Sequence, residues 1–232
     1  MDKWIALAKG PLFAVCFLFM VMGLGRHLAL QLDCLFRRKG RRLKEVQWRS
    51  ILQDSLGWVL PVRHIIQTSS LFSGASYLMH FGLILVPLFL ADHIVLWERF
   101  LGVGLPSLGR MAADILTLLT IACLLVLLFI RTFVAEHRAI SRTSDYLLLI
   151  ALLLPFVSGF LAAHPVLNPL RYQVMFLVHI LSAELLFILV PTTKLAHIVL
   201  YFFDRISQVH WQLRPGAGDK VAEAIYGKGA RV

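Results

Sequence analysis

Long apolar runs dominate the chain and are the first guide to its structure. A run of about 20 mostly apolar residues is long enough to cross a membrane as a helix. Five such runs predict membrane spans near residues 11–32, 73–97, 111–133, 146–163 and 172–203. The fourth run is short at its far end. The fifth is overlong by about ten residues, so we expect it to tilt or to leave the lipid.

The segment between the first two runs, from Lys44 to Thr68, has a different pattern. Its apolar residues recur at helical spacing among basic ones: Trp48, Ile51, Leu52, Leu56 and Val59. This pattern predicts an interfacial amphipathic helix that ends at Pro61. Such a helix serves either as a docking surface for a cytoplasmic subunit or as an adhesion site for anionic lipid, and the sequence leaves both open.

Composition supports an all-α membrane protein. Hydrophobic residues make up 59% of the chain, and the mean hydropathy is +0.77, well above the range of soluble domains. Lys3 and Lys9 precede the first run as in a signal peptide, but no small-residue cleavage site follows, so we expect a retained span. We expect residues 1–204 to form one membrane domain and residues 205–232 a cytoplasmic tail.

The net charge of +10 is distributed unevenly along the chain. Sixteen Lys and Arg residues fall in the loops after the first and third runs and in the tail. The other side has five: Lys3, Lys9, Arg99, Arg110 and Arg171. Positive-inside reasoning therefore predicts an outer N-terminus and a cytoplasmic C-terminus. We expect the membrane to be the bacterial inner membrane. Basic residues that border membrane spans argue against nucleic acid as a partner.

The three cysteines are Cys16, Cys34 and Cys123, and none forms a CxxC or CxxCH motif. The chain therefore carries no sequence motif for an iron–sulfur cluster, a c-type haem or structural zinc. Cys16 and Cys123 fall inside predicted spans, where we expect them to pack. Cys34 lies at a cytoplasmic boundary, where we expect a free thiol.

Four histidines lie inside two of the apolar runs. His179 and His197 are 18 residues apart, which is five whole turns of an ideal helix, so their rings are expected on one face about 27 Å apart. His80 and His93 would point about 140° apart on an ideal helix, but Pro87 lies between them and can kink or unwind it. Because buried ionisable residues are usually functional and neutral imidazole is a standard haem ligand, we predict that these four histidines hold two b-type haems.

Membrane depth predicts how the four ligands pair. His80 and His197 both lie near the cytoplasmic side, and His93 and His179 both lie near the outer side, so each pair is expected to hold one haem iron. Each ligating ring is expected to donate its other N–H to a carbonyl or hydroxyl. Lys194, one turn before His197, either pairs with a haem propionate or snorkels to lipid headgroups.

The remaining five histidines carry weaker signals. His27 and His64 are expected at headgroups or water, and His137 and His210 in solvated cytoplasmic segments. His164, at the outer end of the fourth run, faces either a quinone, a haem propionate or simply the interface.

A group of charged residues follows His93 at the outer end of the second run. Asp92, Glu98 and Arg99 predict a quinol pocket beside the outer haem, with Asp92 or Glu98 as the proton acceptor, whereas a merely solvated helix end is the alternative. Glu184 is predicted to be buried in mid-span. It either hydrogen-bonds a neighbouring helix or helps to move protons.

The stretch from His179 to Phe202 resembles the last span of the respiratory nitrate reductase gamma subunit family. In that family a His, a Pro, a basic residue and a second His recur in the order and spacing of His179, Pro191, Lys194 and His197. The residues at 79–94 resemble the second span of the same family. This resemblance implies a five-span, N-out cytochrome b subunit with two b-type haems. Such a subunit exchanges electrons with a quinone, menaquinone among the candidates, and with a cytoplasmic iron–sulfur subunit.

The second span departs from the nitrate reductase pattern. The spacing from His80 to His93 is longer, and Asp92 stands where that family has a glycine. These features look more like the cytochrome b subunits of the Hmc, Tmc and Dsr types of redox complex in sulfate-reducing bacteria. That resemblance implies a periplasmic multihaem cytochrome c and an NrfD-like membrane subunit as partners. The chain is then an electron-transfer subunit of an oxidoreductase complex rather than an enzyme alone.

A second hypothesis needs no haem. The chain can be a membrane anchor or a proton-coupled transporter subunit, in which buried histidines serve proton relay or packing.

Overall fold

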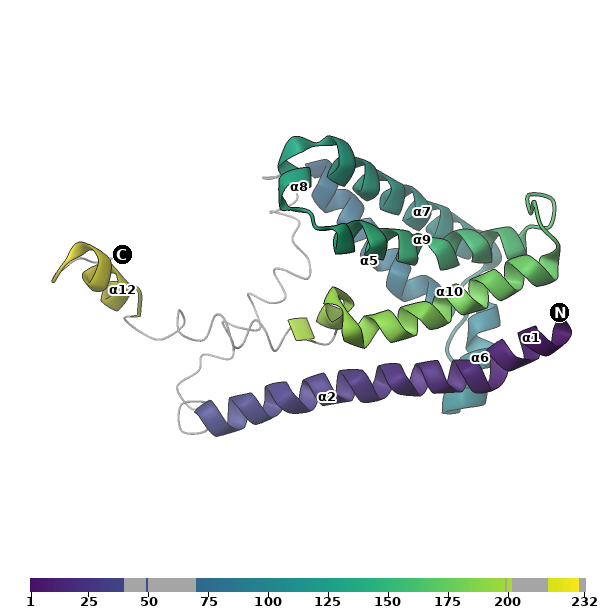
Figure 1. The fold of residues 1–232 in the computed structure, drawn as a ribbon, viewed down its shortest axis with the longest axis horizontal. Helices are drawn as coiled ribbons and strands as arrows, with labels where there is room; N and C mark the ends of the chain where they lie inside the picture. The colour runs from purple at the N-terminus through teal and green to yellow at the C-terminus, as the bar shows by residue number, and fades with distance from the viewer. Residues whose placement is uncertain (40–48, 50–69, 199, 202–216, 230–232) are drawn as a thin grey trace. The chain divides into compact units, whose positions relative to one another are not determined.

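The computed structural model describes residues 1–39, 49, 70–198, 200–201 and 217–229, and helices account for nearly all of them (Figure 1). No strand occurs within these ranges. The chain divides into two compact units. Unit 1 comprises residues 1–15 and 63–186, and unit 2 comprises residues 16–62 and 187–232. The prediction of an all-α fold is confirmed for the described ranges.

Among the described residues, five helices are long and apolar enough to cross a membrane. They cover Asp2–Asp33, Leu71–Phe89, Arg110–Phe133, Thr143–Ala163 and Tyr172–Thr192. Their number and approximate positions agree with the five predicted spans. The chain therefore has the helical content of a multi-pass membrane protein.

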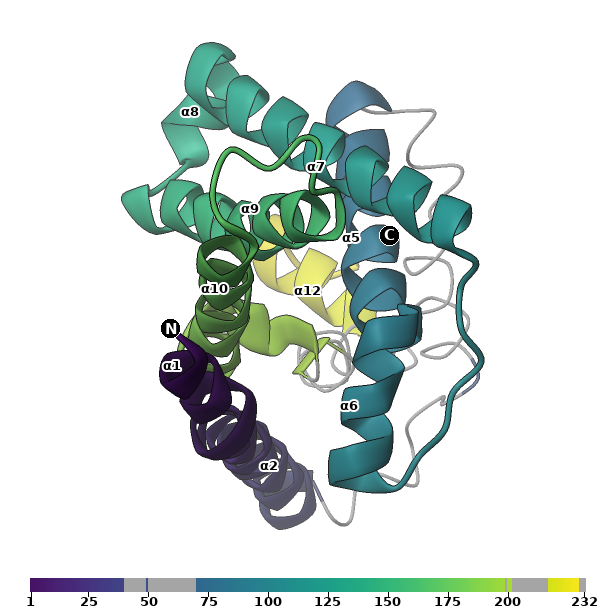
Figure 2. The same cartoon turned by 90° about the vertical axis from the view of Figure 1, so that its right-hand side faces the viewer.

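Three helices of unit 1 lie side by side: α5 (Ser70–Phe89), α7 (Arg110–Phe133) and α9 (Thr143–Ala163) (Figures 1 and 2). A short helix, α8 (Ala135–Ile140), follows α7. The core between α5 and α7 is formed by apolar side chains of both helices: Ala75, Met79, Cys123, Leu124 and Leu127.

The closest approach of α5 to α7 depends on a glycine. A Cβ atom placed on Gly82 would clash with Oγ1 of Thr120, a fully buried residue of α7. No larger residue fits at position 82 without movement of the neighbouring helix. The Thr120 hydroxyl donates to the carbonyl of Leu116 in its own helix at 2.6 Å, so its burial leaves no unpaired donor.

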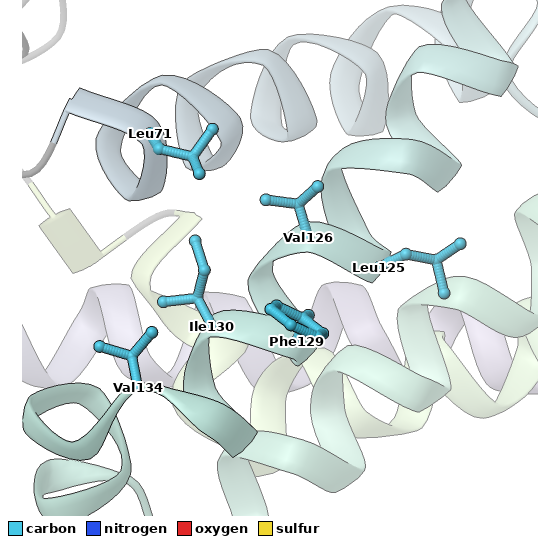
Figure 3. A pocket seen from close by; sticks show the side chains of 6 residues that line it. All are labelled: Leu71, Leu125, Val126, Phe129, Ile130 and Val134. Carbon is cyan, nitrogen blue, oxygen red and sulfur yellow. The ribbon is translucent and has the colours of Figure 1, made fainter.

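The outward surface of α5 and α7 is apolar. Leu71 is 67% exposed and Phe129 60% exposed. Both line an open hollow of about 610 Å³ whose side chains are all apolar: Leu71, Leu125, Val126, Phe129, Ile130 and Val134 (Figure 3). A surface of this kind suits contact with lipid chains and offers no group for acid–base chemistry.

The second predicted span is not one helix. The helix α5 ends at Phe89, Leu90 is extended (φ −67°, ψ 130°), and α6 (Ala91–Leu101) begins directly afterwards (Figure 2). The span predicted over 73–97 thus consists of two helices, and the sequence indicated an interruption near Pro87. Proline supplies no N–H to the preceding turn, which weakens the helix here.

The fifth predicted span is also interrupted. The helix α10 covers Tyr172–Thr192, Thr193 is extended (φ −129°, ψ −171°), and a 3₁₀ turn, η3, covers Lys194–Ala196. The Thr193 hydroxyl oxygen accepts a hydrogen bond from the Leu195 amide at 3.3 Å and thereby caps the new turn. The prediction of one helix over 172–203 is therefore wrong, and the five-turn argument for His179 and His197 fails with it.

The chain begins with a helical stretch without gaps. It consists of α1 (Asp2–Leu7), a π-helical turn η1 (Ala8–Leu12) that contains Pro11, and α2 (Phe13–Lys39). The first span thus starts earlier than residue 11.

Near the C-terminus, the predicted tail contains α12 (Ala217–Tyr226). The fourth span begins at Thr143 rather than 146 and ends at Ala163 as predicted. The interfacial helix predicted between Lys44 and Thr68 lies outside the described residues except for position 49.

Candidate functional site

Two of the predicted ligands, His93 and His179, come together in unit 1. His93 is the third residue of α6, and His179 is the eighth residue of α10. Their rings are half-buried and nearly parallel, at 7°, with centroids 5.9 Å apart. A metal–imidazole bond is about 2 Å long, so two rings on opposite sides of one metal ion have centroids roughly 6 Å apart. The centroid spacing and the parallel planes of the pair agree with those of two imidazoles on opposite sides of one metal ion.

Both rings are held by backbone carbonyls. Nδ1 of His179 lies 2.9 Å from the carbonyl oxygen of Pro155, and Nδ1 of His93 lies 3.2 Å from that of Pro87. A carbonyl oxygen only accepts hydrogen bonds, so each Nδ1 carries the hydrogen and each Nε2 carries a lone pair. A histidine that ligates a metal through Nε2 has this arrangement, as expected from the sequence.

The helix break at Leu90 brings His93 to its carbonyl. Because α5 ends at Phe89, the carbonyl of Pro87 lies in the last turn of the helix. Its oxygen accepts hydrogen bonds from two side chains, His93 and Trp97. Trp97, one turn after His93 on α6, donates its Nε1–H to the same oxygen at 3.1 Å. The interruption thus places an acceptor beside the ring nitrogen of His93.

A glycine makes room for His179. A Cβ atom on Gly159 of α9 would lie 2.8 Å from Cε1 and 2.9 Å from Nδ1 of the His179 ring. Gly159 follows Pro155 by four residues, so both lie on the face of α9 that meets this ring. Sequence reasoning missed Gly159 and the acceptor role of Pro155. Their spacing is a weak signal until the facing helix is known.

The other two predicted ligands show the same ring tautomer. Nδ1 of His80 lies 2.7 Å from the carbonyl oxygen of Ser76, and Nδ1 of His197 lies 2.7 Å from that of Lys194. Both side chains are exposed. His80 belongs to unit 1 and His197 to unit 2. Their predicted pairing across the two units stays a prediction.

The predicted quinone residues share one helix. Asp92, Glu98 and Arg99 are all exposed on α6, and Asp92 lies in its first turn, next to His93. Within the described ranges, the carboxylates of Asp92 and Glu98 form no hydrogen bond or ion pair. The Arg99 guanidinium lies 5.9 Å from the Phe100 ring centroid. A quinol pocket here stays a prediction.

Lys194, the predicted propionate ligand, is exposed at the start of η3. Its backbone carbonyl holds the ring of His197, whereas the role of its ammonium group stays a prediction.

Two histidines expected in polar surroundings are packed instead. His27 is half-buried, and its Nε2 donates to the carbonyl of Pro191 at 2.8 Å, so the prediction of headgroup or water contact is wrong. The His137 ring stacks on Phe72 with centroids 4.4 Å apart, so it is not simply solvated. His27 donates through Nε2, the ring nitrogen that carries no hydrogen in the four predicted ligands. Its tautomer therefore differs from theirs.

His164 forms a contact that sequence reasoning missed. Its Nδ1 lies 2.8 Å from the carbonyl oxygen of Phe160, and its Nε2 lies 3.4 Å from Oδ2 of Asp114. The predictions for His64 and His210 concern positions outside the described residues. Whether His164 meets a quinone, a propionate or the interface stays open.

Glu184, five residues after His179 on α10, is only 2% exposed. Neither of its carboxylate oxygens has a hydrogen-bond partner among the described residues. Cys16 and Cys123 are buried, in keeping with a packing role. In the part of the chain that is described, no three His, Cys, Asp or Glu side chains gather as a metal site. A haem takes only two axial ligands from the protein.

Comparison with known proteins identifies one relative. The chain is 39% identical over 155 residues to a protein of Nitratidesulfovibrio vulgaris, a match that covers 66% of this chain and 67% of that protein. The relative is named only "Protein". No family model matches the chain, and no solved structure matches it.

Proposed function

This chain belongs to the same family as the Nitratidesulfovibrio vulgaris protein, and we propose that it is a dihaem b-type cytochrome subunit of a membrane-bound respiratory redox complex. The observation that carries the proposal is the geometry of His93 and His179. Their parallel rings are 5.9 Å apart, and both Nδ1 atoms are bonded to carbonyls. This arrangement supplies two Nε2 lone pairs to one iron.

The second haem is assigned to His80 and His197. Each ring is already held in the ligating tautomer by a carbonyl of its own segment. With the N-terminus outside and the basic loops in the cytoplasm, this site lies toward the cytoplasmic side and the His93–His179 site toward the outside. Lys194 is then positioned to bind a propionate of the inner haem.

The chemistry that bound haem supplies is reversible one-electron transfer. With two histidines as its protein ligands, each haem would favour electron transfer over oxygen binding. The protein's part is to hold each ring by its N–H. Two sites at different depths carry electrons across the membrane between a quinone pool, or a periplasmic multihaem cytochrome c, and a cytoplasmic iron–sulfur subunit.

A quinol donor, menaquinone among the candidates, has to lose protons as it is oxidised. Asp92 is exposed in the first turn of α6, directly before His93 in the chain, and this position supports a role for its carboxylate at the outer site. We assign proton acceptance to Asp92 or Glu98, with Arg99 orienting the quinone. An NrfD-like subunit is a further partner in this assignment.

One observation favours a second candidate, a haem-free proton-coupled transporter or anchor. The buried Glu184 has no partner among the described residues, and an intramembrane carboxyl of this kind is a common proton carrier. This hypothesis does not explain why both histidines of the pair carry their hydrogen on Nδ1. Proton relay does not require two neighbouring histidines to have the same tautomer.

An optical spectrum of the purified protein separates the two candidates. A dihaem cytochrome gives a sharp alpha band on reduction and two b-type haems per chain by the pyridine haemochromogen assay. Substitution His179→Ala should remove one haem, whereas His137→Ala, a packed histidine of the same unit, should remove none. A purified wild-type protein without haem would exclude the cytochrome proposal.

A further inference from the structure

Two side-chain donors converge on one carbonyl beside the outer haem site. The carbonyl oxygen of Pro87 receives Nδ1–H of His93 at 3.2 Å and Nε1–H of Trp97 at 3.1 Å. Both distances are at the long end of the range for N–H···O bonds. The oxygen has two lone pairs and accepts both bonds, but each donor draws electron density from it and thereby weakens the other bond.

The convergence follows from the local fold. The histidine and the tryptophan are four residues apart on α6, so their side chains lie on one face of that helix. The break at Leu90 ends α5 and turns this face back toward the carbonyl of Pro87. A continuous helix would have engaged that carbonyl with the amide four residues later, at Ala91.

The strength of the hydrogen bond from Nδ1–H of His93 affects the reduction potential of a haem iron that this histidine binds. A ring N–H that donates strongly makes its imidazole a more basic ligand, and a more basic ligand favours the oxidised iron. A second donor at the same oxygen weakens the hydrogen bond from the histidine. The imidazole is then a less basic ligand, which favours the reduced iron.

We propose that Trp97 is a positioning residue that raises the reduction potential of the outer haem by sharing the Pro87 carbonyl with His93. The inference rests on the proposed function, because it requires a haem between His93 and His179. The tryptophan does not touch the iron and acts only through the carbonyl.

The proposal predicts an effect on one haem only. His179, the opposite ligand, bonds to the carbonyl of Pro155 on α9, which also receives the Ser158 hydroxyl at 3.4 Å but, among the described residues, no indole N–H. His80 bonds to Ser76 and His197 to Lys194, so neither inner ligand shares an acceptor with Trp97.

The test is a redox titration of purified full-length protein, followed optically. Trp97→Phe removes the indole N–H, so the midpoint potential of one haem should shift to more negative values while the other stays unchanged and two haems remain bound. Trp4→Phe serves as the matched control, because Trp4 is 64% exposed near the N-terminus. Unchanged potentials, or a shift to more positive values, would overturn the proposal.

A second variant covers the case in which Trp97→Phe disturbs packing and loses the haem. Incorporation of 3-benzothienylalanine at position 97 keeps the shape of the bicyclic ring and replaces only the N–H by sulfur. The same negative shift of one potential is expected, and its absence would overturn the proposal. A wild-type protein that binds no haem is a different result, since it contradicts the proposed function itself.

Discussion

In unit 1, polar side chains on an uninterrupted helix and on an interrupted one differ in the carbonyl groups to which they form hydrogen bonds. The helix α7 runs from Arg110 to Phe133 without interruption, and its buried hydroxyls return to their own helix: Thr117 donates to Ala113 and Thr120 to Leu116. The α5–α6 segment breaks at Leu90, and the first ring after the break reaches back six residues to Pro87. An unbroken helix therefore uses its polar groups for packing, and a break frees a carbonyl that can orient a ring.

The same relation recurs where α10 ends. His197 follows the extended residue Thr193 and the turn η3, and its Nδ1 bonds to the carbonyl of Lys194 at 2.7 Å. Two interruptions thus each precede a predicted ligand. Under the proposed function, the interrupted segments supply His93 and His197 as ligands, whereas α7 gives mechanical support.

The largest expected effect comes from the ligand pair. His93→Ala and His179→Ala should each reduce the haem content from two to one per chain, since loss of either axial ligand empties the same site. The double variant should also retain one haem, measured by pyridine haemochromogen. Retention of two haems in either single variant, or loss of both in the double variant, would break the assignment of the pair to one site.

A large effect on the rate of haem reduction by quinol is expected from a substitution in the first turn of α6. Asp92→Asn should slow the reduction of haem by quinol roughly hundredfold, because a positioned proton acceptor contributes about 10²–10⁴ to such steps. Haem content and reduction by dithionite should not change. Stopped-flow absorbance measures both rates, and an unaltered quinol-driven rate would remove the proton role from Asp92.

A smaller effect is expected where α9 faces the site. Gly159→Ala places a methyl group 2.8 Å from the His179 ring and should weaken haem binding at the outer site by about 10- to 100-fold. Gly74→Ala is the matched control, because a Cβ atom there meets no atom within 4 Å. Haem titration of the depleted protein measures both. Equal affinities in the two variants would contradict the close contact of Gly159 with the ligand.

The smallest effect on the cofactor is expected at the α5–α7 contact. Gly82→Ala overpacks the site of Thr120 and should reduce the free energy of unfolding by about 1–3 kcal/mol without loss of haem. Adding Thr120→Ala removes the clashing hydroxyl and methyl groups and should restore part of the stability. Thermal unfolding in detergent measures both changes. Haem loss in Gly82→Ala at an unchanged melting temperature would argue against a purely mechanical role of α7.

Much of the helical framework could be predicted from the sequence, because long apolar runs have few alternatives to helices in a membrane. The interruptions were harder to place. Pro87 indicated a break between His80 and His93, but the extended residue is Leu90, three positions later. Pro191 lies two residues before the break at Thr193, much as Pro87 precedes Leu90, but an ideal helix was assumed there, and the argument that put His179 and His197 on one face failed.

The details of the candidate site depend on contacts between helices, which spacing within one helix does not reveal. The sequence singled out His93 and His179, because charged or polar rings are rare in apolar runs. It gave no reason to connect Gly159 or Pro155 with His179, since these residues become neighbours only when α9 and α10 pack. Asp114 was missed beside His164 for the same reason.

The proposed cytochrome function depends most on a haem between His93 and His179. An experimental density map of the purified protein tests this directly. We expect a planar macrocycle between α6 and α10, with Nε2 of both histidines on its iron and both Nδ1 atoms still bonded to the carbonyls of Pro87 and Pro155. A map with the two rings in direct contact and no macrocycle between them, or with the iron on other side chains, would contradict the account.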